Sequence, residues 1–205
     1  MKGGKTLYGK RAKKQREMAS LTKIMNLITF LGLVEKYGLN PKTIRVRATK
    51  VASSVEGTTA NIQYMAEYNV DDLLYGMMLP SGNDAAFLVG EIGGYISQKK
   101  GESMGIDELS TALERRQGCY VNAYLREMNS LAQKIGMIKS NFANVHGLSN
   151  IQNISCAEDL ARLCAYAMRN RKFRRVVQTK VFQYCCVVTH QTDGYEDKSQ
   201  TETLR

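Results

Sequence analysis

The segment from Ile24 to Val34 constrains the fold most strongly, because its apolar residues surround a helix on nearly every side. They are Ile24, Met25, Leu27, Ile28, Phe30, Leu31, Leu33 and Val34. A helix of this kind is buried, and the run is too short to span a bilayer, which needs roughly 20 residues. We therefore predict a buried helix that begins near Ser20 and ends at about Tyr37, around which the rest of the chain packs.

Ser20 and Lys23 form a Ser-x-x-Lys pair at the start of this predicted helix. Three residues are nearly one helical turn, so both side chains share a face. A lysine in an apolar pocket has a lowered pKa and can take the proton of a serine hydroxyl, which makes the serine a nucleophile. The alternative is that Ser20 caps the helix and Lys23 is solvated.

A second motif, Ser81-x-Asn83, lies in a predicted turn between two predicted helices, 70–79 and 85–96. A hydroxyl and an amide two residues apart can point into the same cleft. The Ser81 hydroxyl could relay a proton, and the Asn83 amide could hold a substrate carbonyl. The alternative is an ordinary turn followed by a helix cap.

Length and composition indicate how many domains the chain forms and argue against zinc-binding and disulfide-stabilised classes of protein. The chain has 205 residues, enough for one domain with a single core. Its five cysteines include no Cys-x-x-Cys spacing, so neither a zinc site nor a disulfide framework is predicted. The N-terminus lacks the continuous apolar region of a signal peptide.

The net charge of +10 favours acidic partners or surfaces. Basic residues gather at 10–16 and 169–175, without interleaved aromatic residues for base stacking and without a nucleic-acid motif. We therefore expect no nucleic-acid partner. The basic runs are interpreted as solvated faces, with contact to an anionic polymer or membrane surface as the alternative.

Periodicity and turn residues predict an α+β fold, with an antiparallel sheet that joins the two chain ends and a helical region between them. The expected elements are a strand end at 5–9, strands at 43–49 and 181–189, helices at 70–79, 85–96, 119–135 and 155–168, loops at 53–61 and 98–117, and a tail at 193–205 that is mobile or a hairpin arm. The helix at 155–168 is expected to open with a Ser155–Glu158 capping box.

Six stretches in order resemble the D-alanyl-D-alanine carboxypeptidase family, the low-molecular-mass penicillin-binding proteins among the serine penicillin-recognising enzymes. They are Thr6–Lys10, Met18–Met25, Val70–Met78, Pro80–Ala86, Phe142–Leu148 and Ser155–Ala161. The resemblance implies a β-lactamase/DD-peptidase-like fold and no metal or organic cofactor. It further implies a peptidoglycan stem peptide or β-lactam as ligand and an extracytoplasmic location.

Carried over residue by residue, the resemblance implies that Ser20 is the nucleophile and Lys23 its base. It also implies a proton-relay role for Ser81 and a substrate-binding role for Asn83. His146, within the family's His-Gly-Leu segment, looks structural, and Glu158 looks like a capping residue.

The family's third motif, Lys-Thr-Gly or Lys-Ser-Gly, does not occur in this sequence. In the family it lines the far wall of the cleft, where it supplies a cation for the substrate carboxylate and an oxyanion donor. We therefore expect residues 1–205 to form a single, truncated DD-peptidase-like domain, in which 98–117 is a polar insertion loop. The open edge of strand 181–188 should favour self-association. Lys180 and Lys198 are the first candidates for the missing cation.

The sequence thus predicts a serine-type D-Ala-D-Ala carboxypeptidase that acts through an acyl-enzyme on Ser20. The alternative is a catalytically impaired relic that binds peptidoglycan peptides or β-lactams without efficient turnover. A third reading, a basic polymer-binding protein unrelated to peptidases, would require six ordered matches by chance.

Overall fold

The computed structural model describes residues 6, 8–102, 105–189 and 197–204. At its centre lies α1 (Thr22–Lys36), preceded by a single 3-10 turn, η1 (Ala19–Leu21). Eleven residues of α1 are buried, including the polar Thr22, Lys23, Asn26 and Thr29. The prediction of a buried central helix is confirmed, with its α-helical part beginning two residues after Ser20.

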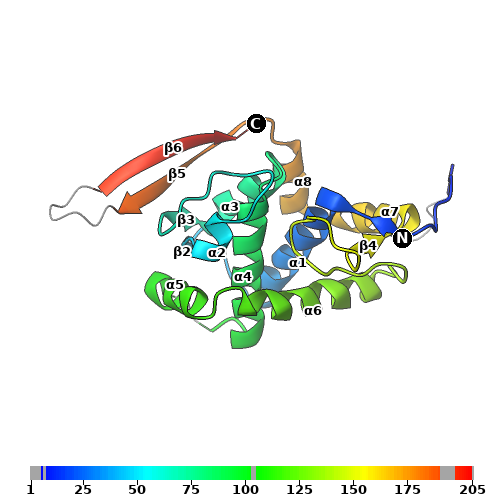
Figure 1. Cartoon of the computed structure of the whole chain (residues 1–205), viewed down its shortest axis with the longest axis horizontal. Coiled ribbons are helices and arrows are strands. Elements are labelled where there is room, and N and C mark those ends of the chain that lie inside the picture. The colour runs from blue at the N-terminus through cyan, green and yellow to red at the C-terminus, as the bar shows by residue number, and fades with distance from the viewer. Residues whose placement is uncertain (1–5, 7, 103–104, 190–196, 205) are drawn as a thin grey trace.

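Five helices pack against α1 (Figure 1). They are α3 (Val70–Met78), α4 (Asn83–Lys99), α6 (Cys119–Lys134), α7 (Ala157–Ala167) and α8 (Arg171–Gln178). Two further helices, α2 (Lys50–Ser53) and α5 (Ile106–Arg115), contact α4. Side-chain caps begin three of these helices, because Thr49, Asn69 and Asn170 accept backbone N–H groups of α2, α3 and α8.

Two antiparallel sheets complete the fold. Strands β2 (Arg45–Arg47), β3 (Glu67–Asn69), β5 (Phe182–Thr189) and β6 (Asp197–Leu204) form one sheet in that order. The β5–β6 hairpin projects to one side of the helical body (Figure 1) and joins β3 through a single paired position, Glu67 with Val187. The second sheet pairs β1 (Arg16–Glu17) with β4 (Ile154–Ser155).

The α+β class is confirmed, but strand pairing differs in detail from the expectation. Among the described residues, the N-terminal strand β1 pairs with β4 rather than with the strands near the C-terminus. Of the two expectations for the tail, the hairpin arm is confirmed, because β6 pairs along β5; the outer edge of this sheet is therefore β6 and not the strand 181–188. The strand end expected at 5–9 lies partly outside the described residues.

Two other local expectations are wrong. Residues 98–117 are not simply a loop, because α5 forms within them and buries Leu109 and Leu113, which are one helical turn apart. The expected capping box is absent: Cys156 occupies the N-cap of α7, Ser155 Oγ lies 2.7 Å from Ser140 Oγ, and Glu158 pairs with Arg162. The helix α8, which overlaps the basic run at 169–175, was not anticipated.

In the part of the chain that the structure describes, no helix is long and apolar enough to cross a membrane. Over the same residues, no group of three or more His, Cys, Asp or Glu side chains is placed to hold a metal ion.

Candidate active site

Ser20 and Lys23 lie where η1 passes into α1. The Lys23 Nζ is 3.3 Å from the Ser20 Oγ, and the Ser20 side chain is exposed while Lys23 is only 2% exposed. Ala19, directly before Ser20, has a φ of 48°, in the left-handed region that a non-glycine residue rarely adopts. Such strain is concentrated at functional sites in proteins, and here it sets the turn that presents the serine.

The Lys23 amino group is held by two oxygens besides the serine hydroxyl. It donates to Asn83 Oδ1 at 2.6 Å and to the backbone carbonyl of His146 at 2.6 Å. Burial lowers the pKa of Lys23 to about 8, against the opposing effect of the Asp84 carboxylate, which raises it. The amine can therefore exist in its neutral form near neutral pH, while three oxygens define its position.

Asn83 reaches Lys23 from the first residue of α4. Its Nδ2 donates to the carbonyl of Glu56 at 2.8 Å, so both ends of the amide are bonded. Gly57 has a φ of +95°, and a Cβ there would lie 2.6 Å from Asn83 Nδ2. The close approach of the 56–57 backbone therefore requires glycine, and it fixes the orientation of the Asn83 amide.

Ser81 lies in the same loop but does not join this network. Its φ of 59° is again left-handed, and its carbonyl accepts the Thr58 hydroxyl at 2.6 Å. Its half-buried hydroxyl makes no hydrogen bond to any residue that the structure describes. The loop geometry thus presents Ser81 beside Asn83 and leaves its hydroxyl available.

Asp84 anchors this loop. The carboxylate is 2% exposed and accepts the backbone N–H groups of Ala60 and Ile62, together with the Thr59 hydroxyl at 2.6 Å. These bonds tie segment 59–62 to the first turn of α4, where the helix dipole favours a negative charge. Asp84 consequently places both the loop and a buried negative charge near Lys23.

The segment 143–148 closes another side of the site. Asn26, one turn beyond Lys23, donates to the carbonyls of Val145 at 2.9 Å and Ala86 at 3.0 Å, which holds this segment and α4 against α1. The His146 imidazole accepts the Leu148 N–H at 3.1 Å, and burial followed by the nearby Lys23 charge lowers the His146 pKa to about 4. The imidazole is therefore neutral at pH 7 and serves its own loop.

The structure brings three of the four candidate residues, Ser20, Lys23 and Asn83, into one hydrogen-bonded cluster and places Ser81 next to it. Sequence reasoning missed the two backbone carbonyls, those of Glu56 and His146, and the roles of Asn26 and Asp84. Only Asn26 and Asp84 could have been found from the sequence, because both are polar side chains next to a motif. Asn26 follows Lys23 by one helical turn, and Asp84 directly follows Asn83.

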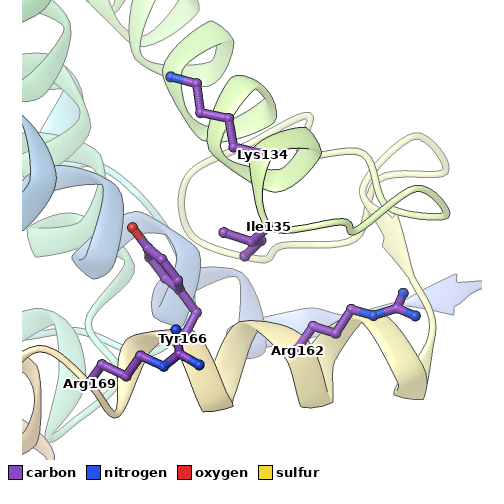
Figure 2. A pocket seen from close by; sticks show the side chains of 5 residues that line it. All are labelled: Lys134, Ile135, Arg162, Tyr166 and Arg169. Carbon is purple, nitrogen blue, oxygen red and sulfur yellow. The ribbon is translucent and has the colours of Figure 1, made fainter. Parts of the chain in front are cut away.

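A cavity of about 370 Å³ lies elsewhere, between the end of α6 and α7 (Figure 2). Its lining consists of Lys134, Ile135, Arg162, Tyr166 and Arg169. None of these residues belongs to the Ser20 cluster. The Arg162 guanidinium is already bonded to Glu158, Asp159 and the carbonyl of Gly136, so this cavity does not extend the candidate site.

Comparison with known proteins agrees with this geometry. A family model described as D-alanyl-D-alanine carboxypeptidase matches residues 1–97 and 110–192. The chain is 30% identical over 180 residues to a D-alanyl-D-alanine carboxypeptidase of Streptomyces sp., covering 87% of this chain and 55% of that protein. It is 27% identical over 158 residues to the D-alanyl-D-alanine carboxypeptidase DacF of Bacillus subtilis, covering 77% of this chain and 34% of that protein.

Among solved structures, the DD-transpeptidase of the same Streptomyces strain superposes with a TM-score of 0.74 at 28% identity, covering 98% of this chain and 68% of that one. The fold is therefore the DD-peptidase fold. The chain spans about half the length of the first of these curated relatives and about a third of the second.

Proposed function

We propose that this chain, which belongs to the D-alanyl-D-alanine carboxypeptidase family, supplies the nucleophile and base of a serine-type carboxypeptidase acting on peptides that end in D-Ala-D-Ala. One observation carries the proposal: the buried Lys23 amino group lies 3.3 Å from the Ser20 hydroxyl and has a pKa lowered to about 8. An amine in that state can accept the serine proton near neutral pH.

The proposed reaction proceeds through an acyl-enzyme. The neutral Lys23 amine takes the Ser20 proton as the oxygen attacks the carbonyl carbon between the two terminal D-alanines. The tetrahedral intermediate then expels the last D-alanine, whose amine leaves with a proton. Water adds to the remaining ester, and Ser20 is released with its proton restored.

Asn83 and Ser81 take positioning and relay roles in this proposal. Asn83 accepts from Lys23 and donates to Glu56, and its Nδ2 retains one further N–H with which to bind a substrate carbonyl. The unengaged Ser81 hydroxyl is the group we assign to carry a proton towards the departing amine.

The second candidate function is binding and acylation without efficient turnover. The described hydrogen-bonding partners of the Ser20 and Lys23 side chains all lie in η1, α1, the start of α4 and segment 143–148. Donors for the oxyanion and a cation for the substrate carboxylate are not among them. One preorganised oxyanion donor alone is worth about 3–4 kcal/mol of barrier, so acylation and turnover can separate.

Covalent labelling tests the nucleophile. Wild-type protein should react with a fluorescent penicillin and carry the label on gel electrophoresis, and Ser20→Ala should abolish it. Ser54→Ala, an exposed serine outside the cluster, is the matched control and should label normally. Label that persists in Ser20→Ala would remove Ser20 from the mechanism. Release of D-alanine from a diacylated D-Ala-D-Ala peptide separates the two candidates.

The same proposal extends to partners. We propose peptidoglycan stem peptides and β-lactams as ligands, and contact with an anionic surface through exposed arginines of α8 such as Arg171 and Arg175. Self-association is proposed through the outer strand β6, where an added strand could pair. Light scattering on the intact chain and on Thr201→Pro, which removes an N–H from β6, tests that association. A dimer that persists unchanged in the proline variant would exclude the β6 edge.

A further inference from the structure

A second cavity, of about 480 Å³, lies beside the turn that presents Ser20. Part of its wall is formed by Met18, two residues before Ser20, and by Leu21, directly after it. Further apolar surface comes from the start of α7, through Cys156, Ala157 and Leu160. The volume falls within the range of roughly 300–1,000 Å³ typical of small-molecule sites. Nothing in the proposed mechanism uses this space.

The rim of the cavity is strongly basic. Lys10, Arg11, Lys14 and Arg16 line it, and among the described residues none of the four makes an ion pair. The one carboxylate in the lining, Glu17, accepts the Ser149 hydroxyl at 3.0 Å. Four cations against one carboxylate leave a local excess of positive charge, which raises the concentration of anions at the cavity mouth.

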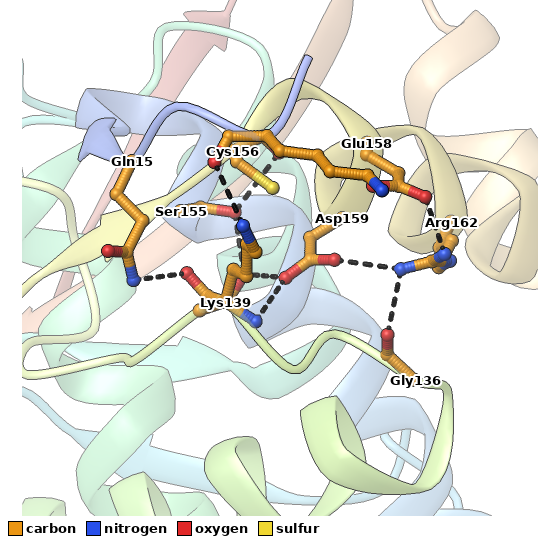
Figure 3. Close-up of polar contacts among 10 residues, drawn as sticks. Gln15, Gly136, Lys139, Ser155, Cys156, Glu158, Asp159 and Arg162 are labelled. Atoms are coloured by element: carbon orange, nitrogen blue, oxygen red, sulfur yellow. Dashed lines mark hydrogen bonds and ion pairs between the residues drawn. The ribbon is translucent and has the colours of Figure 1, made fainter.

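The basic wall is tied down at several points. Gln15 Nε2 donates to the Lys139 carbonyl at 3.0 Å, and the Lys139 N–H donates to Asp159 at 2.8 Å, as Figure 3 shows. The Glu158 N–H bonds the carbonyl of Ala12 at 3.0 Å. Pairing of Arg16 with Ser155 completes the attachment. A preformed wall avoids the cost of ordering a loop when a ligand binds.

The start of α7 adds to the electrostatics. Ala157, its first residue, lines the cavity, so the N-terminus of α7 faces the same space as the four cations. Glu158 and Asp159 in this first turn offset part of the helix dipole, and both pair with Arg162. The cavity therefore combines an apolar floor with a basic rim, and the four cations supply most of its positive charge.

We propose that this cavity is a binding site for an oxyanion carried on a short apolar chain, with either a carboxylate or a phosphate as the charged group. The apolar residues receive the chain, since moving its CH₂ groups out of water favours binding. The rim cations bind the oxyanion. Purely polar anions and neutral alcohols each satisfy only half of the site.

Binding of hexyl phosphate and hexanoate to the full chain tests the proposal. The buried Met18 methyl group, labelled with carbon-13, reports occupancy by NMR and can be assigned with Met18→Leu. Both amphiphiles should shift this resonance saturably, whereas hexanol and inorganic phosphate should do so only at far higher concentration. Equal binding of hexanol would overturn the proposal.

Two pairs of matched variants locate the site. Lys14→Gln with Arg16→Gln should raise the dissociation constant for hexyl phosphate about tenfold. Lys42→Gln with Lys50→Gln removes the same charge at two exposed positions outside the cavity and should change this dissociation constant less than about twofold. Equal weakening by both pairs would mean that only the net charge of the protein matters.

A third test fills the cavity with a larger apolar side chain and leaves all charged residues unchanged. Ala157→Leu should abolish hexyl phosphate binding, and Ala161→Leu, an exposed α7 position outside the lining, should not. Unchanged affinity in Ala157→Leu would overturn the proposal. Both substitutions are at exposed helical positions, so circular dichroism should show folded protein in each case.

A final arm distinguishes the source of the anion, and it alone rests on the proposed function. After acylation of Ser20 by penicillin, unchanged affinity for hexanoate indicates a separate amphiphile. Lost affinity indicates that the site receives an acidic arm of the molecule bound at Ser20. If penicillin does not label the protein, the proposed function fails, while the cavity variants still decide the binding site.

Discussion

At the scale of single residues, the chemistry of the site depends on the burial of one amino group. Lys23 would be solvated at almost any surface position, but here it is 2% exposed and bonded to Asn83 and to the His146 carbonyl. Desolvation penalises its charged form and outweighs the attraction of Asp84, so its pKa falls to about 8. Burial thus positions the amine and also leaves part of it unprotonated near neutral pH, where it can accept a proton.

The pH dependence of acylation should follow Lys23. Because the reactive form is the neutral amine, the rate of penicillin labelling should rise with pH and reach half its plateau near pH 8. Stopped labelling reactions between pH 6 and 10 measure this. Lys23→Ala should reduce the rate to background across the range, and His146→Ala should retain the midpoint, because its carbonyl is backbone. A profile flat from pH 6 to 10 would contradict the base assignment.

Gly147 should be intolerant of a side chain. Its φ is +97°, and a Cβ would lie 2.1 Å from the Ala19 carbonyl oxygen and 2.9 Å from the Ser20 nitrogen. Gly147→Ala should therefore displace the Ser20 turn and slow penicillin labelling by at least about tenfold, which corresponds to about 1.4 kcal/mol. Gly136→Ala is the control: the φ of Gly136 is also positive, at +82°, but an added Cβ there would have no neighbouring atom within 4 Å. This variant carries backbone strain without a clash and should be labelled at the normal rate.

At the scale of elements, α4 organises the site and its surroundings. Its first turn carries Asn83 and Asp84, and two turns further on Glu91 is fully buried. The Glu91 carboxylate accepts the Thr49 hydroxyl at 2.7 Å and the Gly118 N–H at 3.0 Å, which joins α4 to the starts of α2 and α6. Burial, with a smaller contribution from the Glu114 charge on α5, raises the Glu91 pKa to about 7 against the lowering effect of these two hydrogen bonds.

Glu91 should make stability depend on pH. Since the pKa of Glu91 is raised on folding, the folded protein binds the proton more tightly than the unfolded chain does. The resulting contribution to the free energy of unfolding is full below about pH 4.5 and is lost as pH rises through 7. Glu91→Gln should therefore flatten the decline in melting temperature between pH 5 and 8 and raise stability at pH 8. The exposed Glu35→Gln should leave the decline in place. An unchanged slope in Glu91→Gln would mean that other groups cause it.

At the scale of the whole molecule, the β5–β6 hairpin is attached to the helical body through β5, whose Tyr184 and Cys186 side chains are buried in the core. Beyond the single pair with β3, Tyr184 donates to the Ala60 carbonyl at 2.9 Å, and the Phe182 ring stacks on Tyr75 with centroids 3.8 Å apart. The body around α1 contains most of the buried apolar residues. Local opening of the hairpin should therefore cost much less than global unfolding.

Hydrogen exchange should resolve this difference. Phe182→Ala removes the stacked pair, so β5 amides should exchange faster while amides of α1 retain their protection. Val181→Ala, at an exposed neighbouring position just before β5, is the control and should change neither. Equal acceleration in β5 and α1 would show that the hairpin and the body unfold as one unit.

The sequence by itself determined the elements whose signals are local. The all-round apolar segment specified a buried helix, the Ser-x-x-Lys spacing placed both side chains on one face, and Pro80 with the following turn separated α3 from α4. The polarity of 98–117 obscured α5, although Leu109 and Leu113 were already at helical spacing. A local hydrophobicity pattern does not reveal a helix such as α5, which is held in place by only a few apolar residues.

Only the tertiary structure decided how Lys23 is held. Apart from Ser20, the acceptors at its amino group come from positions 60 and 123 residues further along the chain, and one of them is the backbone oxygen of His146. Every residue carries such an oxygen, so no side-chain pattern announces which one will bind. Packing of α4 and segment 143–148 against α1 selects it, and the same packing excludes the water that would otherwise keep the lysine charged.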